Sequence, residues 1–303
     1  MKAIVTGGCG FIGSNLVEEL SKSMDVTVID NLSTGSPLNL NGIDVKLVKG
    51  DILSLNLLKQ VFKGADYVFH LAAVVSVQES VESPVRANEV NVKGTINVLE
   101  AARIRDVEKI IYSSSCAVYG DSDALPLKET TLPEPKSPYA VSKLAAENYC
   151  KVYSEIYGLK SVSLRYFNVY GPKQDPFSDY AAVIPKFISR VLQGENPIIY
   201  GDGEQTRDFI YVKDVVRANM LVMEKGEGVY NIASGKSVSI NELARLICRI
   251  AGKNIDPIYE KEREGDIRHS VADISRTKEI GFKPNYSLEE GLAETIEYWK
   301  GKL

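Results

Sequence analysis

The stretch TGGCGFIG, residues 6–13, stands between a short apolar run at 3–6 and a helical pattern at 11–21. It holds two overlapping glycine spacings, GxGxxG from Gly8 and GxxGxxG from Gly7. Glycines permit a tight turn, let the backbone approach a pyrophosphate, and allow the N–H groups of a helix N-terminus to face that anion. Such turns are common between strands and helices, so the string gains its weight from its place between the two.

An acidic residue, Asp30, ends the next apolar run, about 20 residues further along the chain. A carboxylate at this place can bind the ribose diol of adenosine and repel a 2′-phosphate, which favours NAD over NADP. Strand, turn, helix and carboxylate in this order predict a dinucleotide site rather than a simple turn at Asp30 and Asn31. Asp51, after the third run, is open to two interpretations, an adenine contact or a helix cap.

Apolar runs alternate with helical patterns through the first half of the chain. We interpret as buried strands the runs 3–6, 26–30, 45–48, 67–71, 110–114 and 161–167, and as helices 11–21, 87–103 and 139–157. Such alternation predicts βαβ units. The expected fold is therefore α/β, a doubly wound parallel (Rossmann) sheet with helices on both faces.

The alternation stops after Asn168, where Gly-, Pro- and Asp-rich stretches mix with short helical patterns. A chain of 303 residues is long enough for two domains that share a core. We expect a smaller, mixed α/β lobe that binds the substrate. The predicted division is an NAD-binding Rossmann domain at 1–167, to which 212–235 return, and a substrate lobe at 168–211 and 236–303.

The composition is that of a globular protein, with 44% hydrophobic and 25% charged residues. A net charge of −4 argues against a large basic surface, so we expect no nucleic-acid partner. No apolar run approaches ~18 residues and the chain opens in a strand pattern, so we expect no membrane partner and a cytoplasmic location. Four scattered cysteines without a CxxC pair and two histidines predict neither a disulfide framework nor a metal site.

Tyr139 and Lys143 stand four residues apart and therefore share one face of a predicted helix. The spacing alone proves little, because Tyr298 and Lys302 repeat it near the end of the chain, where we interpret it as a surface coincidence. Position separates the two pairs. The first follows a serine run that ends at Ser115, at the end of a predicted parallel strand, where doubly wound sheets bind their ligands.

Together these residues resemble the extended short-chain dehydrogenases/reductases, and most closely the NAD-dependent nucleotide-sugar 4-epimerases of the UDP-glucose 4-epimerase type. The resemblance runs nearly from end to end. Its motifs are TGGxGFIG at 6–13, DNLSTG at 30–35, HLAA at 70–73, NVKGT at 91–95, SSSxxVYG at 113–120, YxxxK at 139–143, RYFNVYGP at 165–172, TRDFIYVxD at 206–214 and REGDxRxSxAD at 263–273.

The resemblance implies three sets of site residues. The catalytic set is Tyr139, Lys143 and Ser115. The cofactor set for NAD is Gly7, Gly10, Phe11, Ile12, Gly13, Asp30, Asn31, Ser33, Thr34, Gly35, Asp51, Ile52, Leu71, Ala72, Ala73, Asn91, Ser113, Tyr139, Lys143 and Tyr166. The set for a UDP-sugar is Ser115, Tyr139, Asn168, Val183, Arg207, Arg263 and Asp266.

The chemistry accounts for the residue types. Oxidation of a sugar alcohol removes the hydroxyl proton while hydride leaves the same carbon, so a base must sit beside the nicotinamide. We expect a Tyr139 phenolate, favoured by the positive charges of Lys143 and the oxidised nicotinamide, with Ser115 bonded to the reacting oxygen. The resemblance implies that hydride leaves sugar C4 and that the same retained cofactor returns it to the other face.

Related enzymes that catalyse other reactions differ from this chain at a few positions. Dehydratases carry an acidic pair where this chain has Cys116 and Ala117, which argues against a 4,6-dehydratase. The Cys116 thiol could be an acid or base, as in related 3,5-epimerases, although there the cysteine falls one position later and a buried cysteine is usually inert. A lysine that reaches the cofactor phosphates in some relatives is replaced by Val75. A small Ser270 could admit N-acetylated sugars.

Two other functions remain open. A nucleotide-sugar 4-reductase would use the same residues but exchange its cofactor at each turnover. A nonenzymatic dinucleotide-binding regulator would typically lack the Tyr/Lys pair.

The helices near 87–103 and 139–157 also resemble those that pair as a four-helix bundle in family homodimers, with Val90, Tyr149 and Tyr153 as contacts. The alternative is that these helices pack only on their own sheet, which uses one face of each helix in any case.

Overall fold

A computed structural model describes residues 1–177, 181–262 and 267–302 of the chain. Its centre is a seven-stranded sheet in the order β10-β6-β5-β4-β1-β2-β3, and every neighbouring pair in it is parallel. The predicted α/β fold with a doubly wound sheet is confirmed. The strands are β1 (Lys2–Thr6), β2 (Asp25–Asp30), β3 (Lys46–Lys49), β4 (Tyr67–His70), β5 (Lys109–Ser115), β6 (Lys160–Tyr166) and β10 (Gly228–Ile232).

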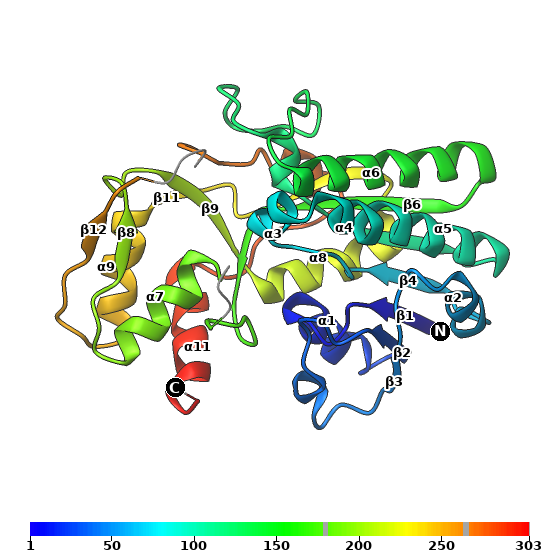
Figure 1. Cartoon of the computed structure of the whole chain (residues 1–303), viewed down its shortest axis with the longest axis horizontal. Coiled ribbons are helices and arrows are strands. Elements are labelled where there is room, and N and C mark those ends of the chain that lie inside the picture. The colour runs from blue at the N-terminus through cyan, green and yellow to red at the C-terminus, as the bar shows by residue number, and fades with distance from the viewer. Residues whose placement is uncertain (178–180, 263–266, 303) are drawn as a thin grey trace.

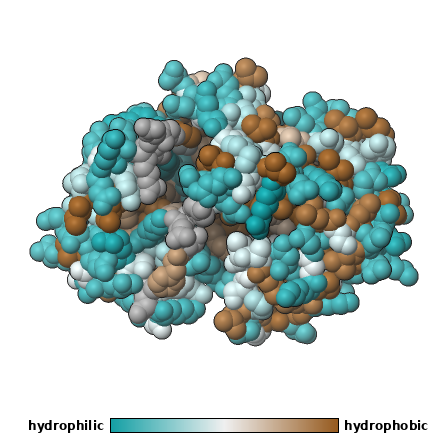
Figure 2. All heavy atoms as spheres, viewed as in Figure 1, coloured by the Kyte–Doolittle hydropathy of each residue, from teal (hydrophilic) through white to brown (hydrophobic). Residues whose placement is uncertain are grey.

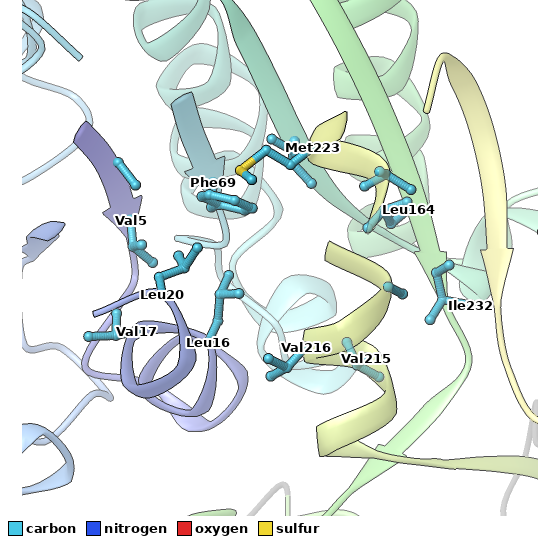
Figure 3. Packing of buried hydrophobic residues seen from close by; sticks show 14 of the residues in the cluster. Val5, Leu16, Val17, Leu20, Phe69, Leu164, Val215, Val216, Met223 and Ile232 are labelled. Atoms are coloured by element: carbon cyan, nitrogen blue, oxygen red, sulfur yellow. The ribbon is translucent and has the colours of Figure 1, made fainter. Parts of the chain in front are cut away.

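Helices cover both faces of this sheet (Figure 1). Successive strand residues point to opposite faces, so Val5 of β1 lies in the core with α1 (Phe11–Leu20) and α8 (Val212–Lys225). Figure 3 shows Leu16 and Leu20 of α1 directed toward the same core as Val216. Ile4, the neighbour of Val5, lies in the opposite core, with residues from α2 (Leu55–Val61), α5 (Gly94–Ile104) and α6 (Pro138–Tyr157).

The single helix expected at 87–103 is interrupted. A short α3 (Val77–Glu82) and α4 (Pro84–Asn88) lead into a π-helical turn, Glu89–Lys93, before α5 begins. Apolar periodicity could not reveal the interruption, because a π turn changes the backbone hydrogen bonds while the buried face continues. Such turns are frequent at functional sites. This one holds the side chain of Asn91 inside the protein.

A second, smaller lobe lies at the left of Figure 1. It contains the sheet β11-β9-β7, the pair β12-β8 and a core of its own under α7, α9 and α11. Its elements are β7 (Asn168–Tyr170), α7 (Val183–Leu192), β8 (Ile198–Tyr200), β9 (Thr206–Tyr211), β11 (Ser237–Ser239), α9 (Ile240–Ile250), β12 (Ile258–Glu260) and α11 (Leu288–Lys300). Between β9 and β11 the chain passes through α8, which packs on the large sheet, and β10, which is the edge strand of that sheet beside β6. The division into two domains stays a prediction.

The remaining short elements are α10 (Ser275–Glu279) and the 3₁₀ turns Pro37–Leu40 and Cys116–Tyr119. No helix within the described ranges is both long and apolar enough to span a bilayer.

A buried ion pair joins α6 to the sheet. Glu147 of α6 and Arg165 of β6 form two close contacts, Nη2–Oε2 at 2.8 Å and Nε–Oε1 at 3.0 Å, with both side chains about 5% exposed or less. The Ser114 hydroxyl of β5 donates to the same carboxylate, and the guanidinium lies 4.7 Å from the centre of the Tyr119 ring. This pair therefore fixes α6 over the ends of two strands.

Arg165→Met should destabilise the protein by roughly 3–5 kcal/mol, because it leaves the Glu147 carboxylate buried without its counter-charge. Equilibrium urea unfolding measures the change. The double variant Arg165→Met/Glu147→Leu, which removes both charges, should recover most of this loss. A double variant as unstable as the single one would contradict the assignment of the cost to an unpaired buried charge.

Candidate active site

A large cavity of about 1310 Å³ lies at the carboxyl ends of the sheet strands. Its wall includes the last residues of β5 and residues that follow β1, β2 and β4, together with residues of the second lobe, such as Arg207 and Phe209 of β9. Doubly wound sheets bind their ligands at this edge. The cavity also has room for more than one ligand of ordinary size.

The glycine turn forms one end of the cavity. Gly7 has a φ of +71°, and a Cβ there would lie 2.7 Å from the amide nitrogen of Ala72. A Cβ on Gly13 would lie 2.2 Å from the Gly7 carbonyl oxygen. The N-cap of α1 is Gly10, so the first turn of that helix begins at the cavity wall. This arrangement fits a pyrophosphate group, whose charge the helix N-terminus favours.

Asp30 ends β2 at the cavity wall and also holds the loop that follows. Its Oδ2 accepts the Cys9 N–H at 2.9 Å, and its Oδ1 accepts the Leu32 N–H at 2.8 Å. A carboxylate has about four acceptor sites, so capacity remains for a ribose diol. Asp51 likewise lies on the wall and accepts the N–H of Leu53 at 2.9 Å, so it makes a turn before α2 while facing the cavity.

The predicted catalytic residues meet on α6 and at the end of β5. The Ser137 hydroxyl accepts the Ala140 N–H at 3.2 Å and starts the helix, which places Tyr139 in its first turn and Lys143 one turn later. The Lys143 ammonium is buried and donates to the carbonyl of Ser113 at 2.8 Å. It lies 5.9 Å from the centre of the Tyr139 ring.

The electrostatics differ from the expectation for Tyr139. Burial raises the pKa of its phenol to about 12, and a hydrogen bond from Ser115 acts in the opposite direction. Burial likewise lowers the pKa of Lys143 to about 8, against the attraction of Glu147. The predicted lowering of the Tyr139 pKa by Lys143 is therefore not seen: burial is the largest cause of the shift, and Lys143 is not among its causes. The positive charge of an oxidised nicotinamide near the phenol would attract the phenolate and so lower the pKa of Tyr139.

Cys116 follows Ser115 but does not line the cavity. Burial raises the pKa of its thiol to about 12. The side chain packs with the cluster around Val118 and Phe167. A thiol with this pKa stays protonated at neutral pH and is a poor acid or base, in line with its interpretation as packing.

Most of the predicted site residues lie on this one cavity. Asn91 is the described exception: its amide is buried behind the wall, where it bonds to the backbone of Val74 and to Ser142. Arg263 and Asp266 lie outside the described residues. The residues that line the cavity are Gly7, Gly10, Phe11, Ile12, Gly13, Asp30, Asn31, Ser33, Thr34, Gly35, Asp51, Ile52, Leu71, Ala72, Ala73, Ser113, Ser115, Tyr139, Lys143, Tyr166, Asn168, Val183 and Arg207.

Sequence reasoning missed several wall residues. Tyr298 and Trp299 of α11 line the cavity. The Lys302 ammonium lies over the Tyr298 ring, 3.4 Å from its centre. The interpretation of this Tyr/Lys spacing as a coincidence stays a prediction, but Tyr298 itself was not expected at the cavity. Lys173 also lines the wall and binds Glu18 of α1 at 2.8 Å. Lys173 directly follows the motif at 165–172, and this position could have indicated from the sequence that it lies at the cavity. Nothing in the local pattern at 298–299 points to a cavity.

Comparison with known proteins identifies the family of this chain. Residues 3–233 match the NAD dependent epimerase/dehydratase family. The chain belongs to this family. NAD is therefore its cofactor, and the glycine cradle and Asp30 fit that group.

Three solved structures are similar to this chain over nearly their whole length. One is a UDP-N-acetylglucosamine 4-epimerase from Methanobrevibacter ruminantium M1 in complex with UDP-N-acetylmuramic acid, 48% identical, with a TM-score of 0.97 over 100% of this chain and 99% of that one. A UDP-glucose 4-epimerase from Thermotoga maritima with UDP-glucose is 42% identical, with a TM-score of 0.96 over 99% of each chain. The UDP-glucose 4-epimerase from Thermus thermophilus, in complex with NAD, is 39% identical, with a TM-score of 0.94 over 100% of each chain.

The buried charge of Lys143 should make Lys143→Met more stable than the natural protein at pH 7, by on the order of 3 kcal/mol, because its pKa falls from 10.5 to about 8 on folding. Between these two pH values the unfolded chain binds more protons than the folded one, so the natural protein gains stability as pH rises. The advantage of the variant should therefore shrink between pH 8 and pH 10.5.

Urea unfolding at pH 7 and pH 10 measures this difference. Lys49→Met, at an exposed position on β3, is the control and should change stability little at either pH. A Lys143→Met variant less stable than the natural protein at pH 7 would contradict a net cost of burying that ammonium.

Proposed function

We propose that this protein is a nucleotide-sugar 4-epimerase that interconverts UDP-glucose and UDP-galactose through reversible oxidation at C4 with retained NAD. One observation carries the proposal: Tyr139, Ser115 and Lys143 meet at a cavity whose wall is shared by the glycine turn and the second lobe. A dinucleotide and a sugar nucleotide can therefore reach one set of reacting groups.

The chain's own residues handle the proton and the oxygen. Bound NAD supplies a reversible hydride exchange, which makes C4 planar and allows it to be rebuilt from either face. Tyr139 accepts the proton of the C4 hydroxyl and later returns it. Ser115 donates to the same oxygen, so the charge that develops there is held by a placed hydroxyl.

Lys143 has a holding role. Its ammonium is anchored to the Ser113 carbonyl at 2.8 Å, which leaves further N–H bonds for the nicotinamide ribose. Arg207 of β9 reaches the cavity from the second lobe and is our candidate for the substrate diphosphate, because a guanidinium fork suits phosphate oxygens. Asn168 and Val183 lie on the same wall.

A 4,6-dehydratase is less well supported by this site. Elimination of water needs an acid and a base next to the reacting carbon. The positions after Ser115 hold Cys116, whose pKa of about 12 keeps it protonated, and Ala117, which has no titratable group. These two residues offer nothing for that step, whereas proton exchange at one hydroxyl needs only Tyr139.

Two sugar pairs fit the proposed chemistry, UDP-glucose/UDP-galactose and UDP-GlcNAc/UDP-GalNAc. Ser270 is buried and is not among the cavity-lining residues. Its predicted effect on N-acetylated sugars stays a prediction, and the assay below measures the acceptance of such sugars directly.

Epimerase activity should appear when purified protein is incubated with UDP-galactose and no added cofactor, followed by proton NMR beside a UDP-GalNAc sample. Tyr139→Phe should reduce turnover by about 10²-fold or more while NAD binding persists, because it removes the proton acceptor. Tyr67→Phe, whose hydroxyl bonds to Glu108 at 3.2 Å on another part of the sheet, is the matched control.

Each outcome of this assay is informative. Conversion only after NAD is added would support the chemistry and show a loosely held cofactor, in line with Val75. Formation of NADH in proportion to a 4-keto sugar, once NAD is added, would instead support a net oxidoreductase such as a 4-reductase observed in its reverse direction. Near-normal turnover by Tyr139→Phe would contradict the assignment of the base.

We also propose a homodimer through α5 and α6. Large apolar side chains stand exposed on this face: Val141, Val152 and Ile156 of α6 are 53%, 40% and 68% exposed, and Ile104 of α5 is 40% exposed. Apolar atoms are visible over this region on the right of Figure 2. Tyr149 is 39% exposed and fits this surface, whereas the expected contact Tyr153 is buried in its own subunit.

Val152→Glu/Ile156→Glu should convert the dimer to a monomer in light scattering after gel filtration, because two charges would be buried at the interface. Ile258→Glu, at an exposed apolar position on β12, is the control and should stay dimeric. A natural protein that is monomeric at all concentrations would contradict the proposal.

A further inference from the structure

A chain of buried hydrogen bonds runs from the glycine turn to the catalytic helix. The Thr6 hydroxyl, directly before Gly7, lies 2.7 Å from Nδ1 of His70. Nε2 of His70 lies 2.9 Å from the hydroxyl of Thr95, which donates to the carbonyl of Asn91 at 2.6 Å. These bonds join β1, β4, α5 and the π turn.

The chain continues from the π turn to α6. The Asn91 amide donates to the Ser142 hydroxyl at 2.9 Å, and that hydroxyl donates to the carbonyl of Tyr139 at 2.7 Å. The same amide binds both backbone groups of Val74, at 2.8 and 2.9 Å, just after the cavity loop at 71–73. Every side chain in this series is 2% exposed or less.

The hydrogen positions in this chain follow from counting protons. A hydroxyl has a single proton, and that of Thr95 is used toward the Asn91 carbonyl. Thr95 must therefore accept from His70, so Nε2 carries the hydrogen. Neutral imidazole has only one N–H, so Nδ1 accepts from Thr6. Burial lowers the pKa of His70 to about 3, which keeps the ring neutral.

Both ends of the chain touch groups that form the site. The Thr6 hydroxyl also accepts the N–H of Ala72 at 3.3 Å, and both Gly7 and Ala72 line the cavity. At the other end, the Tyr139 carbonyl belongs to the first turn of α6. A change in any member would therefore shift the phenol relative to the cofactor loops.

We propose that the Thr6–His70–Thr95–Asn91–Ser142 chain sets the distance between the cofactor loops and Tyr139, with His70 and Thr95 as positioning residues for the reaction. This inference rests on the proposed function. None of the three hydroxyls and neither ring nitrogen lines the cavity, so the chain acts through the groups that do.

Thr295 provides a matched comparison for Thr95. Both threonines are 1% exposed, and each donates to the carbonyl four residues earlier in the chain at 2.6 Å. Only Thr95 has the second partner, His70. A difference between the two Thr→Val variants therefore reports the link to His70 rather than the loss of a buried hydroxyl.

Thr95→Val should lower kcat by about 10- to 100-fold with little change in the KM for UDP-galactose, because small displacements of reacting groups cost rate while the second lobe still binds substrate. Thr295→Val should keep kcat near the natural value. Thr95→Ser, which retains the hydroxyl, should restore most of the lost rate. Equal kcat for Thr95→Val and the natural protein would overturn the proposal.

NMR tests the chain without any turnover. The protein has two histidines, so ¹⁵N-labelled histidine gives two sets of ring signals, of which that lost in His70→Asn belongs to His70. At pH 7 His70 should show the Nε2–H tautomer, and Thr95→Val should shift its Nε2 signal while Thr295→Val leaves it unchanged. An Nδ1–H tautomer in the natural protein would overturn the proton assignment.

The two measurements separate the inference from the proposed function. If the natural protein converts no UDP-sugar but His70 behaves as stated, the proposed function fails and the hydrogen-bond chain stands. If the natural protein is an epimerase and Thr95→Val behaves like Thr295→Val in both measurements, the positioning role fails and the function stands.

Discussion

The bond from the Lys143 ammonium to the Ser113 carbonyl aligns α6 with the end of β5, and the geometry of the site depends on it. Tyr139 lies one turn before Lys143 on the same helix face, and Ser115 lies two residues beyond Ser113 on the strand. The position of Lys143 against the sheet buries its positive charge, and this burial lowers the pKa of the ammonium. Glu147, one turn later, attracts that charge while its own charge is matched by Arg165. Burial of Lys143 on α6 thus lowers the stability of the protein, and the attraction of Glu147 reduces this loss.

We propose that the two lobes divide the binding of two anionic ligands, in a chain with a net charge of −4. On the large sheet, the glycine turn meets phosphate through backbone N–H groups and a helix N-terminus, which need no cationic side chain. On the second lobe, Arg207 brings a guanidinium to the cavity. The predicted catalytic residues line the same cavity, so in the proposed mechanism a sugar nucleotide bound from one side meets a dinucleotide bound from the other.

Much of the fold could be predicted because buried parallel strands are apolar runs and their order along the chain is regular. The predicted strands correspond to β1 through β6, and the glycine turn, Asp30 and the Tyr/Lys pair lie where their motifs placed them. The features that were missed depend on tertiary structure. The π turn at 89–93, the approach of Tyr298 to the cavity and the raised pKa of Tyr139 come from packing between distant segments, which no local pattern encodes.

In the proposed mechanism, one site removes hydride from sugar C4 and returns it to the same sugar, and Tyr139 moves the proton. Conversion of UDP-galactose that carries deuterium at C4, in the presence of excess unlabelled NADH, tests this mechanism. UDP-glucose should retain deuterium at C4, because the cofactor stays bound between the two half-reactions. UDP-glucose with hydrogen at C4 would rule out transfer through a retained cofactor.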